Sequence, residues 1–493
     1  MCAHRWVYPI VLLLLLAGIA GVHVAVLCPG HNWGDDFAMY VLHARNLVEG
    51  RAYGDTGYVY NPHDPVVGPP TYPPVTAALL APVYTARGLD FWAMKCVMVG
   101  CFTVFLGCVA WLFGRQLPGW QTLGLIAVLG LNWFFVHSSN TINSDQPFLV
   151  FLYLSFCLLE RQQAATSTAG RLGWSVALGL CMYLAFGART LGVLLVPSLL
   201  IAEGCSARRI RRETLLALGV FACLAGVQTL WLHSDRAYLE QLRPQGAALA
   251  AHALSYAQRW AAFFSNGYWK APAAVLFLLV TALSGLGFVQ RLRQRVRALD
   301  VFCLLYLAAI LAWPSYQGER YLYPLLPLWL FYSLHGLRHP WLAARPRLGR
   351  TLVAGVVLVV AGSYVARWTD LGLEAIDEGV TSPNASALFE ELRRQTAPDE
   401  VLVCIKPRAL ALLTGRPASV YHCPADDAEL WGYLRQIGAR YLVTVERDEA
   451  LGRMADARRS AYLRGFVQRN AGLLEEAYRN ADFRVFRILE GPT

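Results

Sequence analysis

Two adjacent carboxylic acids, Asp35 and Asp36, follow shortly after a long apolar segment near the N-terminus. An apolar surface solvates a carboxylate poorly, which raises its pKa and makes it a stronger proton acceptor. One of the two could take a proton from a hydroxyl nucleophile while its neighbour holds a metal ion or the acceptor molecule. Capping of a helix that begins here is the alternative interpretation.

A third acid, Asp145, lies in the segment Asn143-Ser144-Asp145-Gln146-Pro147, where a later apolar run begins. An acid in this position can cap a helix whose first turn contains Pro147. Taken alone, Asp145 is explained by capping.

Two arginines lie beside apolar segments where a positive charge is costly. Arg189 interrupts the run Phe186-Gly187-Ala188-Arg189-Thr190, and Arg320 precedes the proline-rich segment Tyr323–Pro327. Ionisable residues in such places indicate a functional role, and the planar guanidinium group suits a phosphate. Together they could clamp a lipid phosphate. The alternatives are snorkelling of Arg189 to the membrane surface and pairing of Arg320 with Glu319.

The remaining motifs give no cofactor. The chain has no phosphate-binding glycine loop, no zinc spacing and no nucleophile elbow. A divalent cation stays possible but is not required by the sequence. Several histidines show no metal-ligand spacing and are expected to be structural or interfacial: His31, His43, His63, His137, His233 and His252.

The elements that must position these residues are membrane helices. The chain is 56% hydrophobic and only 15% charged, with a mean hydropathy of +0.39, well above the values of soluble proteins. The first run is too long for a signal peptide and lacks a small-residue cleavage site, so we expect an uncleaved span. About eleven spans are predicted, near residues 7–28, 91–113, 120–137, 146–160, 171–187, 190–204, 214–232, 271–290, 300–314, 321–337 and 350–366.

The distribution of arginine predicts the orientation of these spans. The net charge of +10 lies mostly in short loops between apolar runs, which argues against nucleic acid as a partner. If the N-terminus is cytoplasmic, the basic clusters 208–212, 291–297 and 338–350 all fall inside, as the positive-inside rule expects. This arrangement requires residues 171–204 to form two spans. It also puts all three candidate acids and both arginines on the outer face.

Two long outer loops follow from this topology, residues 29–90 and 233–270. The first is predicted to contain a helix over Phe37–Glu49, capped by Asp35 or Asp36 and ended by Gly50. A second helix, Val75–Ala86, follows a proline-rich segment. Amphipathic helices of this kind are expected to lie along the membrane surface.

The tail, residues 367–493, changes to a charged, alternating pattern and is predicted to be a small extracytoplasmic α/β domain. Its two cysteines, Cys404 and Cys423, could be bridged or unpaired. Helices are expected at 388–395, 407–414 and 429–438, and strands at 400–405, 419–422, 441–445 and 483–488.

The segment from Asp35 to Gly50 resembles the first outer loop of C-class (GT-C) membrane glycosyltransferases. Within that class it is similar to bacterial families related to the protein O-mannosyltransferases and to the aminoarabinose and galacturonic acid transferases. Further matching features are Tyr72-Pro73-Pro74, Asp145 before a later span, Arg189 in a glycine-rich turn and Arg320 before a late span. The resemblance covers residues 7–366 and the appended soluble domain.

The resemblance implies an inverting transfer of a sugar from a polyprenyl-phosphate donor to a hydroxyl of a glycan, lipid or protein acceptor. Asp35 or Asp36 would be the general base, Asp145 and Tyr72 would support the acceptor site, and Arg189 and Arg320 would hold the donor phosphate. The protein would lie in the bacterial inner membrane. The main alternative is a transporter or flippase for a polyprenyl-linked lipid, although no internal repeat favours it; a non-catalytic scaffold is a third.

Overall fold

The chain forms two compact units in the structure, a computed structural model. It describes residues 3–207, 209–232, 246–265, 270–313, 316–340, 344–369 and 379–489. The helical unit comprises Met1–Val26, Met98–Ser139 and Ser144–Gly372, and the mixed unit comprises Leu27–Val97, Asn140–Asn143 and Leu373–Thr493. The first outer loop and the tail therefore belong to one unit. The predicted division of the chain into a membrane domain, residues 1–366, and a soluble tail, residues 367–493, stays a prediction.

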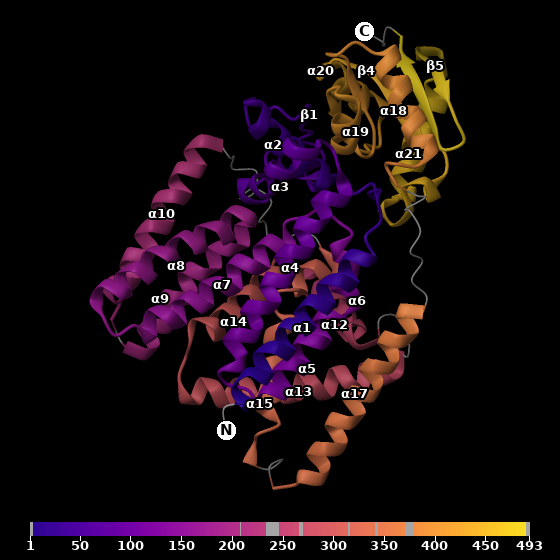
Figure 1. Cartoon of the computed structure of the whole chain (residues 1–493). Helices are drawn as coiled ribbons and strands as arrows, with labels where there is room; N and C mark the ends of the chain where they lie inside the picture. The colour runs from indigo at the N-terminus through magenta and orange to yellow at the C-terminus, as the bar shows by residue number, and fades with distance from the viewer. Residues whose placement is uncertain are drawn as a thin grey trace. The chain divides into compact units, whose positions relative to one another are not determined.

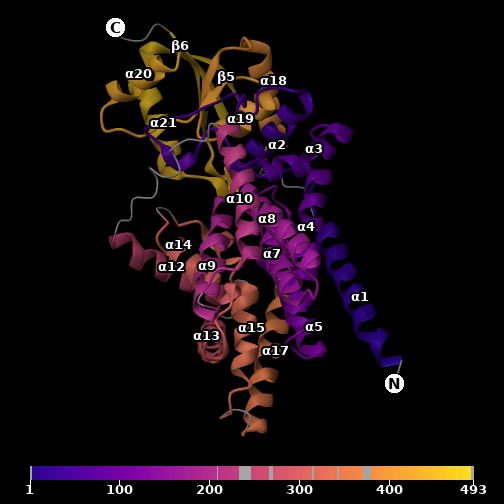
Figure 2. The same ribbon diagram turned by 90° about the vertical axis from the view of Figure 1, so that its left-hand side faces the viewer.

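The helical unit is built from long apolar helices (Figures 1 and 2). Helices α7, α8 and α10 pack side by side, and α13 packs along α15. The elements are α1 (Ala3–Ala25), α4 (Phe91–Gly114, whose first turns belong to the mixed unit), α5 (Gly119–Gly130), α6 (Trp133–Ser139), α7 (Asp145–Ala164), α8 (Thr168–Ala188), η2 (Thr190–Leu194), α9 (Leu195–Ala207), α10 (Arg212–Leu232), α12 (Gly246–Ser265), α13 (Lys270–Gln294), α14 (Ala298–Leu311), η3 (Gly318–Leu322), α15 (Leu326–Gly336) and α17 (Pro346–Thr369).

Five of the described helices are long and apolar enough to cross a membrane: Val7–Ala25, Phe91–Gly114, Thr168–Ala188, Arg212–Leu232 and Lys270–Gln294. Helices α5 and α6, bent by 53° at their break, make a sixth if they form one span. The other predicted spans fall on α7, α9, α14, α15 and α17, which are shorter or less apolar. The multi-span membrane character is thus confirmed, and the count of eleven stays a prediction.

The predicted break at Arg189 is present. Arg189 has an extended backbone (φ −145°, ψ 134°) between α8 and η2. Gly192 then lies against the end of α8, where a Cβ atom would come within 2.5 Å of the backbone nitrogen of Phe186. Only a glycine allows the chain to return so closely, so the two apolar segments cannot form one straight helix.

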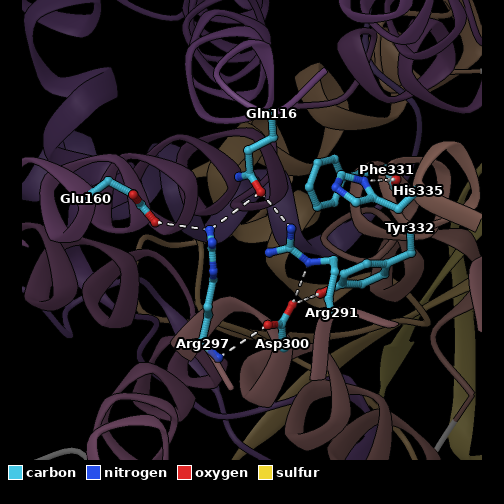
Figure 3. A network of polar contacts seen from close by, with 8 residues as sticks. All are labelled: Gln116, Glu160, Arg291, Arg297, Asp300, Phe331, Tyr332 and His335. Carbon is cyan, nitrogen blue, oxygen red and sulfur yellow. Dashed lines mark hydrogen bonds and ion pairs between the residues drawn. The ribbon is translucent and has the colours of Figure 1, made fainter. Parts of the chain in front are cut away.

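A buried polar network joins α13, α14 and α15 in the helical unit (Figure 3). The side chain of Arg291 lies 3.4 Å from Asp300 and donates a hydrogen bond of 2.6 Å to Gln116. Tyr332 donates to the same Asp300 carboxylate at 2.8 Å, and the Arg291 guanidinium lies over the ring of Phe331. Arg291, counted as a loop charge in the orientation argument, is therefore buried and paired.

The mixed unit is organised around a six-stranded sheet of order β1-β3-β2-β4-β6-β5. Strands β1, β3, β2 and β4 are mutually parallel, and β6 and β5 complete the sheet in antiparallel fashion. The strands are β1 (Tyr58–Val59), β2 (Val401–Val403), β3 (Ala418–Ser419), β4 (Ala439–Val445), β5 (Leu474–Arg479) and β6 (Phe483–Ile488). The first strand comes from the outer loop and the other five from the tail.

The helices of the mixed unit connect or cover these strands. Helix α2 of the outer loop packs against α19 of the tail, and the two lie side by side in Figure 1. The unit contains α2 (Asp35–Glu49), η1 (Pro65–Val67), α3 (Pro74–Arg87), α18 (Pro383–Gln395), α19 (Pro407–Thr414), α20 (Asp427–Gln436), η4 (Asp448–Met454), α21 (Ala457–Arg469) and η5 (Ala471–Leu473).

The predicted elements of this unit are present, but α18 begins five residues before the predicted 388–395 and β3 shares only Ser419 with the predicted strand 419–422. Helix α19 and strand β6 have the predicted bounds, and α2 ends at Gly50, which adopts the left-handed conformation (φ 66°). The strands β1 and β5, the helix α21 and the short 3₁₀ helices η1, η4 and η5 were not predicted. Cys404 is buried, Cys423 is exposed, and both are free.

Candidate functional site

Asp145 lies at the first turn of α7 and is almost fully buried, with 1% of its side chain exposed. Arg320 donates from Nε to one carboxylate oxygen at 2.6 Å, and Arg189 forms an ion pair with the other. Two guanidinium groups against one carboxylate leave a net positive charge of one. This arrangement can bind an anion.

The two arginines are brought together by an extended break and a short 3₁₀ helix, not by α-helices. Arg189 is held in the extended break between α8 and η2, and its guanidinium lies 4.7 Å from the ring centre of Tyr321. Arg320 belongs to η3, which begins at Gly318 with a positive φ of 67°. The next residue, Tyr321, thereby stacks on the first arginine while Arg320 binds the acid.

The contacts of these three residues bear on the simpler explanations given above. Ser144 is the N-cap residue of α7 and its side chain makes no capping bond, so Asp145 is not a cap. Glu319 pairs with Arg259 at 2.8 Å. Arg320 and Arg189 both bind Asp145. The capping interpretation of Asp145 is wrong, and the snorkelling and Glu319-pairing interpretations stay predictions.

Asp35 and Asp36 lie in the first turn of α2, in the mixed unit. Gly34 is the N-cap residue and no side chain caps the helix, so the prediction that one of the acids caps it is wrong. The N-terminal end of a helix still favours negative charge nearby. The helix end therefore stabilises the negative charge of the two carboxylates, although neither residue is the N-cap.

Asp36 ends a chain of hydrogen bonds that begins in the tail. Arg408, fully buried in α19, donates to the hydroxyl of Tyr72 at 2.5 Å and to the carbonyl of Pro69 at 2.8 Å. The Tyr72 hydroxyl donates in turn to Asp36 at 2.7 Å. Gly68 lies so close that a Cβ atom would come within 3.1 Å of the guanidinium. Linked bonds of this kind polarise one another and orient the carboxylate.

Neighbouring groups keep Arg408 positively charged. Burial alone would lower the pKa of Arg408, but Tyr72, Tyr58 and the two acids keep it above its ordinary value. The guanidinium lies between the rings of Tyr58 and Tyr72, at 4.7 and 4.8 Å from their centres. It is thus a permanent buried cation beside the acid pair.

Asp35 has a different environment from its neighbour. Its carboxylate accepts a hydrogen bond of 3.3 Å from the backbone N–H of Ala409, near the start of α19. Burial raises the pKa of Asp35 above its ordinary value, although Lys406 and Arg408 oppose the shift. A carboxylate with a raised pKa is a stronger base than an ordinary aspartate.

His43 fixes the position of Tyr72 through a hydrogen bond to its backbone. Its Nδ1 bonds the carbonyl of Tyr53 at 2.8 Å, and its Nε2 accepts from the backbone N–H of Tyr72 at 3.1 Å. The ring is fully buried, and burial lowers the pKa of His43 to about 4. His43 is therefore neutral, with its proton on Nδ1. The expectation of a structural role is consistent with these bonds.

The candidate residues thus form two sets, each within one unit. Asp145, Arg189 and Arg320 converge in the helical unit, and Asp35, Asp36 and Tyr72 converge in the mixed unit. Sequence reasoning missed Lys406 and Arg408, which complete the second set. The sequence feature that could have identified them is the pair of basic residues on either side of Pro407, at the start of an otherwise apolar helix.

The chain resembles solved structures of membrane glycosyltransferases over its whole length. ArnT from Cupriavidus metallidurans matches over 100% of both chains, with a TM-score of 0.60 and 14% identity in the apo state. Its structure bound to undecaprenyl phosphate matches with a TM-score of 0.58 and 13% identity. The apo oligosaccharyltransferase of Archaeoglobus fulgidus matches over 90% of this chain and 71% of its own, with a TM-score of 0.58 and 11% identity.

The sequence itself matches no family profile and no curated protein. Identities this low establish the fold alone. ArnT and the archaeal oligosaccharyltransferase are both GT-C membrane glycosyltransferases, which confirms the resemblance given by the outer-loop motifs. The chain is therefore a multi-span membrane protein with the GT-C fold.

Proposed function

We propose that this protein is an inverting glycosyltransferase that moves a sugar from a polyprenyl-phosphate donor to an acceptor hydroxyl on the extracytoplasmic face of the membrane. The observation that carries the proposal is the convergence of Arg189 and Arg320 on one buried carboxylate. The relatives of the same fold support it, because one is described bound to undecaprenyl phosphate and another in complex with a dolichol-phosphate.

The arginine pair suits a departing lipid phosphate. When the bond between the anomeric carbon and the phosphate oxygen breaks, the phosphodiester becomes a monoester and gains negative charge. Arg189 and Arg320 supply fixed positive charge for that oxygen, and such preorganised stabilisation is a large term in catalysis. Asp145 holds both guanidinium groups in place between turnovers and supports the acceptor side of the site.

The acid pair supplies the base. The acceptor hydroxyl attacks the anomeric carbon from the face opposite the phosphate, its proton passes to a carboxylate, and the configuration inverts. The environment of Asp35, with its raised pKa and a long bond of 3.3 Å from the backbone N–H of Ala409, suits the base. Asp36, bonded by Tyr72 and facing Arg408, suits the positioning of the acceptor.

The sidedness of the reaction rests on the arginine distribution. With eleven spans and a cytoplasmic N-terminus, residues 1–366 form the membrane domain and residues 367–493 lie outside, in the periplasm of a bacterium. Nucleotide sugars are confined to the cytoplasm, so a transferase facing outward needs a donor delivered through the lipid. A polyprenyl-phosphate sugar meets that requirement. Candidate acceptors are a cell-envelope glycan such as lipopolysaccharide, a lipid or a protein.

The test uses the donor that the protein would consume. The polyprenyl-phosphate sugar that accumulates in a strain lacking the gene is isolated and added to the reconstituted full-length protein with envelope acceptors. We expect transfer of the sugar by the wild type and by the exposed-residue controls Asp399→Asn and Arg212→Gln. If Asp35→Asn and Asp36→Asn both transfer sugar as fast as the wild type, the proposed site fails.

The same preparation tests the flippase alternative. Movement of the lipid across vesicles without any sugar transfer would replace the enzyme assignment by transport. Sugar transfer in detergent, where no leaflet separates donor from acceptor, favours the enzyme.

A further inference from the structure

The parallel pairing of β1 with β3 brings two histidines to the same edge of the sheet. Tyr58 pairs with Ala418 and Val59 with Ser419. His63 lies four residues after the end of β1, and His422 lies three residues after the end of β3. Because parallel strands end at a common edge, two residues that are distant in the chain become neighbours.

A carboxylate completes this group. Glu429 lies in the first turn of α20, the helix that follows β3, and its Oε1 is 3.5 Å from Nε2 of His422. The rings of His63 and His422 are stacked, with centroids 4.7 Å apart and planes 23° apart. One ligand atom from each of the three side chains lies within 4.8 Å of the other two.

His422 is the buried member of the group. Only 8% of the residue is exposed, yet within the described residues Nδ1 makes no hydrogen bond and Nε2 has no closer polar contact than the 3.5 Å to Glu429. Buried ring nitrogens normally have a partner, and leaving them unsatisfied costs free energy. His63 and Glu429 are both exposed, so the open side of His422 can be reached from solvent.

Neighbouring residues hold the two histidines in place. Asn61 accepts a bond from the backbone N–H of His63 and donates to the carbonyl of Val420, at 2.9 and 2.8 Å. The ring of Tyr433 stands edge-on to both imidazoles, and its hydroxyl bonds Ser419 at 2.6 Å. These contacts fix the backbone of His63 and the planes of both rings.

We infer that His63, His422 and Glu429 bind a zinc ion, with water as the fourth ligand. Two imidazoles and a carboxylate are a ligand set that Zn²⁺ accepts in tetrahedral geometry. Such a site needs ligand atoms about 3.3 Å apart, given metal–ligand distances near 2.0 Å. Rotation of the exposed His63 and Glu429 side chains brings them toward the fixed His422.

The bound ion ties the outer loop to the sheet of the tail. His63 belongs to the loop and the other two ligands to the tail, so the metal cross-links segments that are far apart in sequence. A metal that binds the folded state alone stabilises it by mass action. The site contains none of the proposed transfer residues and is independent of the proposed function.

The experiment measures Zn²⁺ binding to the full-length protein, purified without a polyhistidine tag and stripped with a chelator. We expect one Zn²⁺ per chain, a rise in the unfolding temperature on adding Zn²⁺, and a visible absorption band when Co²⁺ replaces it. His63→Gln and Glu429→Gln should each weaken binding by at least about tenfold and abolish the temperature rise. Glu475→Gln, an exposed glutamate of the same unit, is the matched control.

Two results would overturn the site: a wild-type protein that binds no Zn²⁺, or variants that bind it as tightly as the wild type. His422→Asn is added with a check of its circular dichroism, because that residue is buried. The test does not depend on it, since the two exposed ligands can be replaced without disturbing the core.

Discussion

The Nε atom of Arg320 lies 2.6 Å from a carboxylate oxygen of Asp145, a residue 175 positions earlier in the chain. The bond joins η3 to the first turn of α7, and Arg189 binds the second oxygen of the same acid. A charged group 1% exposed is stable only when it is paired in this manner. Within this cluster, two guanidinium groups and one carboxylate sum to a charge of +1.

Replacing Arg320 should weaken the binding of lipid phosphate. With Arg320→Gln we expect the affinity for polyprenyl phosphate to fall about tenfold, which corresponds to the loss of one charge-assisted bond. Arg320→Lys should recover part of the loss, because it keeps the charge without the planar fork. Competition against the donor measures both, with Arg212→Gln as the control. Equal affinity in Arg320→Gln would remove this residue from the donor site.

Asp145→Asn should destabilise the helical unit. The change leaves two guanidinium groups with no carboxylate between them, and breaking a buried pair costs about 3–5 kcal/mol. The thermal unfolding midpoint should fall, and high salt should restore part of it by screening the arginines. A midpoint within error of the wild type would mean that the pair contributes nothing to stability.

Asp35→Asn should separate stability from activity. Burial raises the pKa of Asp35, so ionising this group destabilises the folded protein relative to the unfolded chain. The destabilisation is absent at low pH, where the acid is protonated in both states, and is complete once the pH exceeds the raised pKa. The neutral isostere removes the penalty, and the unfolding midpoint at pH 7 should stay the same or rise. The transfer rate should fall about 10²- to 10⁴-fold. A lower midpoint with full activity would contradict both parts.

Tyr72→Phe should disconnect Arg408 from Asp36. The hydroxyl accepts from one and donates to the other, and its loss leaves a buried guanidinium with fewer partners. We expect a cost of about 1–3 kcal/mol in stability and a smaller effect on rate than that of Asp35→Asn. Chemical denaturation measures the first and the transfer assay the second. Tyr462→Phe, in a different helix of the same unit, is the control.

Acid should destabilise the mixed unit through His43. Its pKa is lowered from 6.5 to about 4 by burial, so the unfolded chain takes up the proton first. The stability associated with neutral His43 is complete above pH 6.5 and is lost as the pH falls toward 4, by about 3 kcal/mol. Since burial also lowers the pKa of His31, to about 3, the measurement is the difference in pH dependence between wild type and His43→Gln. Parallel curves would contradict the assignment.

Much of the architecture could be predicted because it depends on local pattern. Apolar runs, Gly50 and the alternation of helices and strands in the tail all act over a few residues. Strand β1 could not be predicted, since two residues carry no pattern and their partner lies in the tail. Strand β5 reads Leu-Glu-Glu-Ala-Tyr-Arg and shows no clear apolar period. Helix α21 does carry its buried residues Leu463, Phe466 and Val467 at helical spacing, so it could have been predicted from the sequence.

The candidate sites were predicted in part for the same reason. A charge in an apolar segment marks Arg189, and an acid pair beside a span marks Asp35 and Asp36. The role of Arg408 depends on the packing of α19 against α2, which no local pattern encodes. His63 and His422 lack metal-ligand spacing in the sequence because a strand pairing, not a turn, makes them neighbours.

The sheet of the mixed unit has a consequence for synthesis. Val59 pairs with Ser419, which lies 360 residues later in the chain. Nearly all of the membrane portion must therefore be synthesised before the first outer loop can gain this strand neighbour. During that interval the loop lacks its strand neighbour and the helix that packs on α2. A chain cut short before the tail would leave the loop without these partners, and in the proposed topology it would be open to proteases outside the cytoplasm.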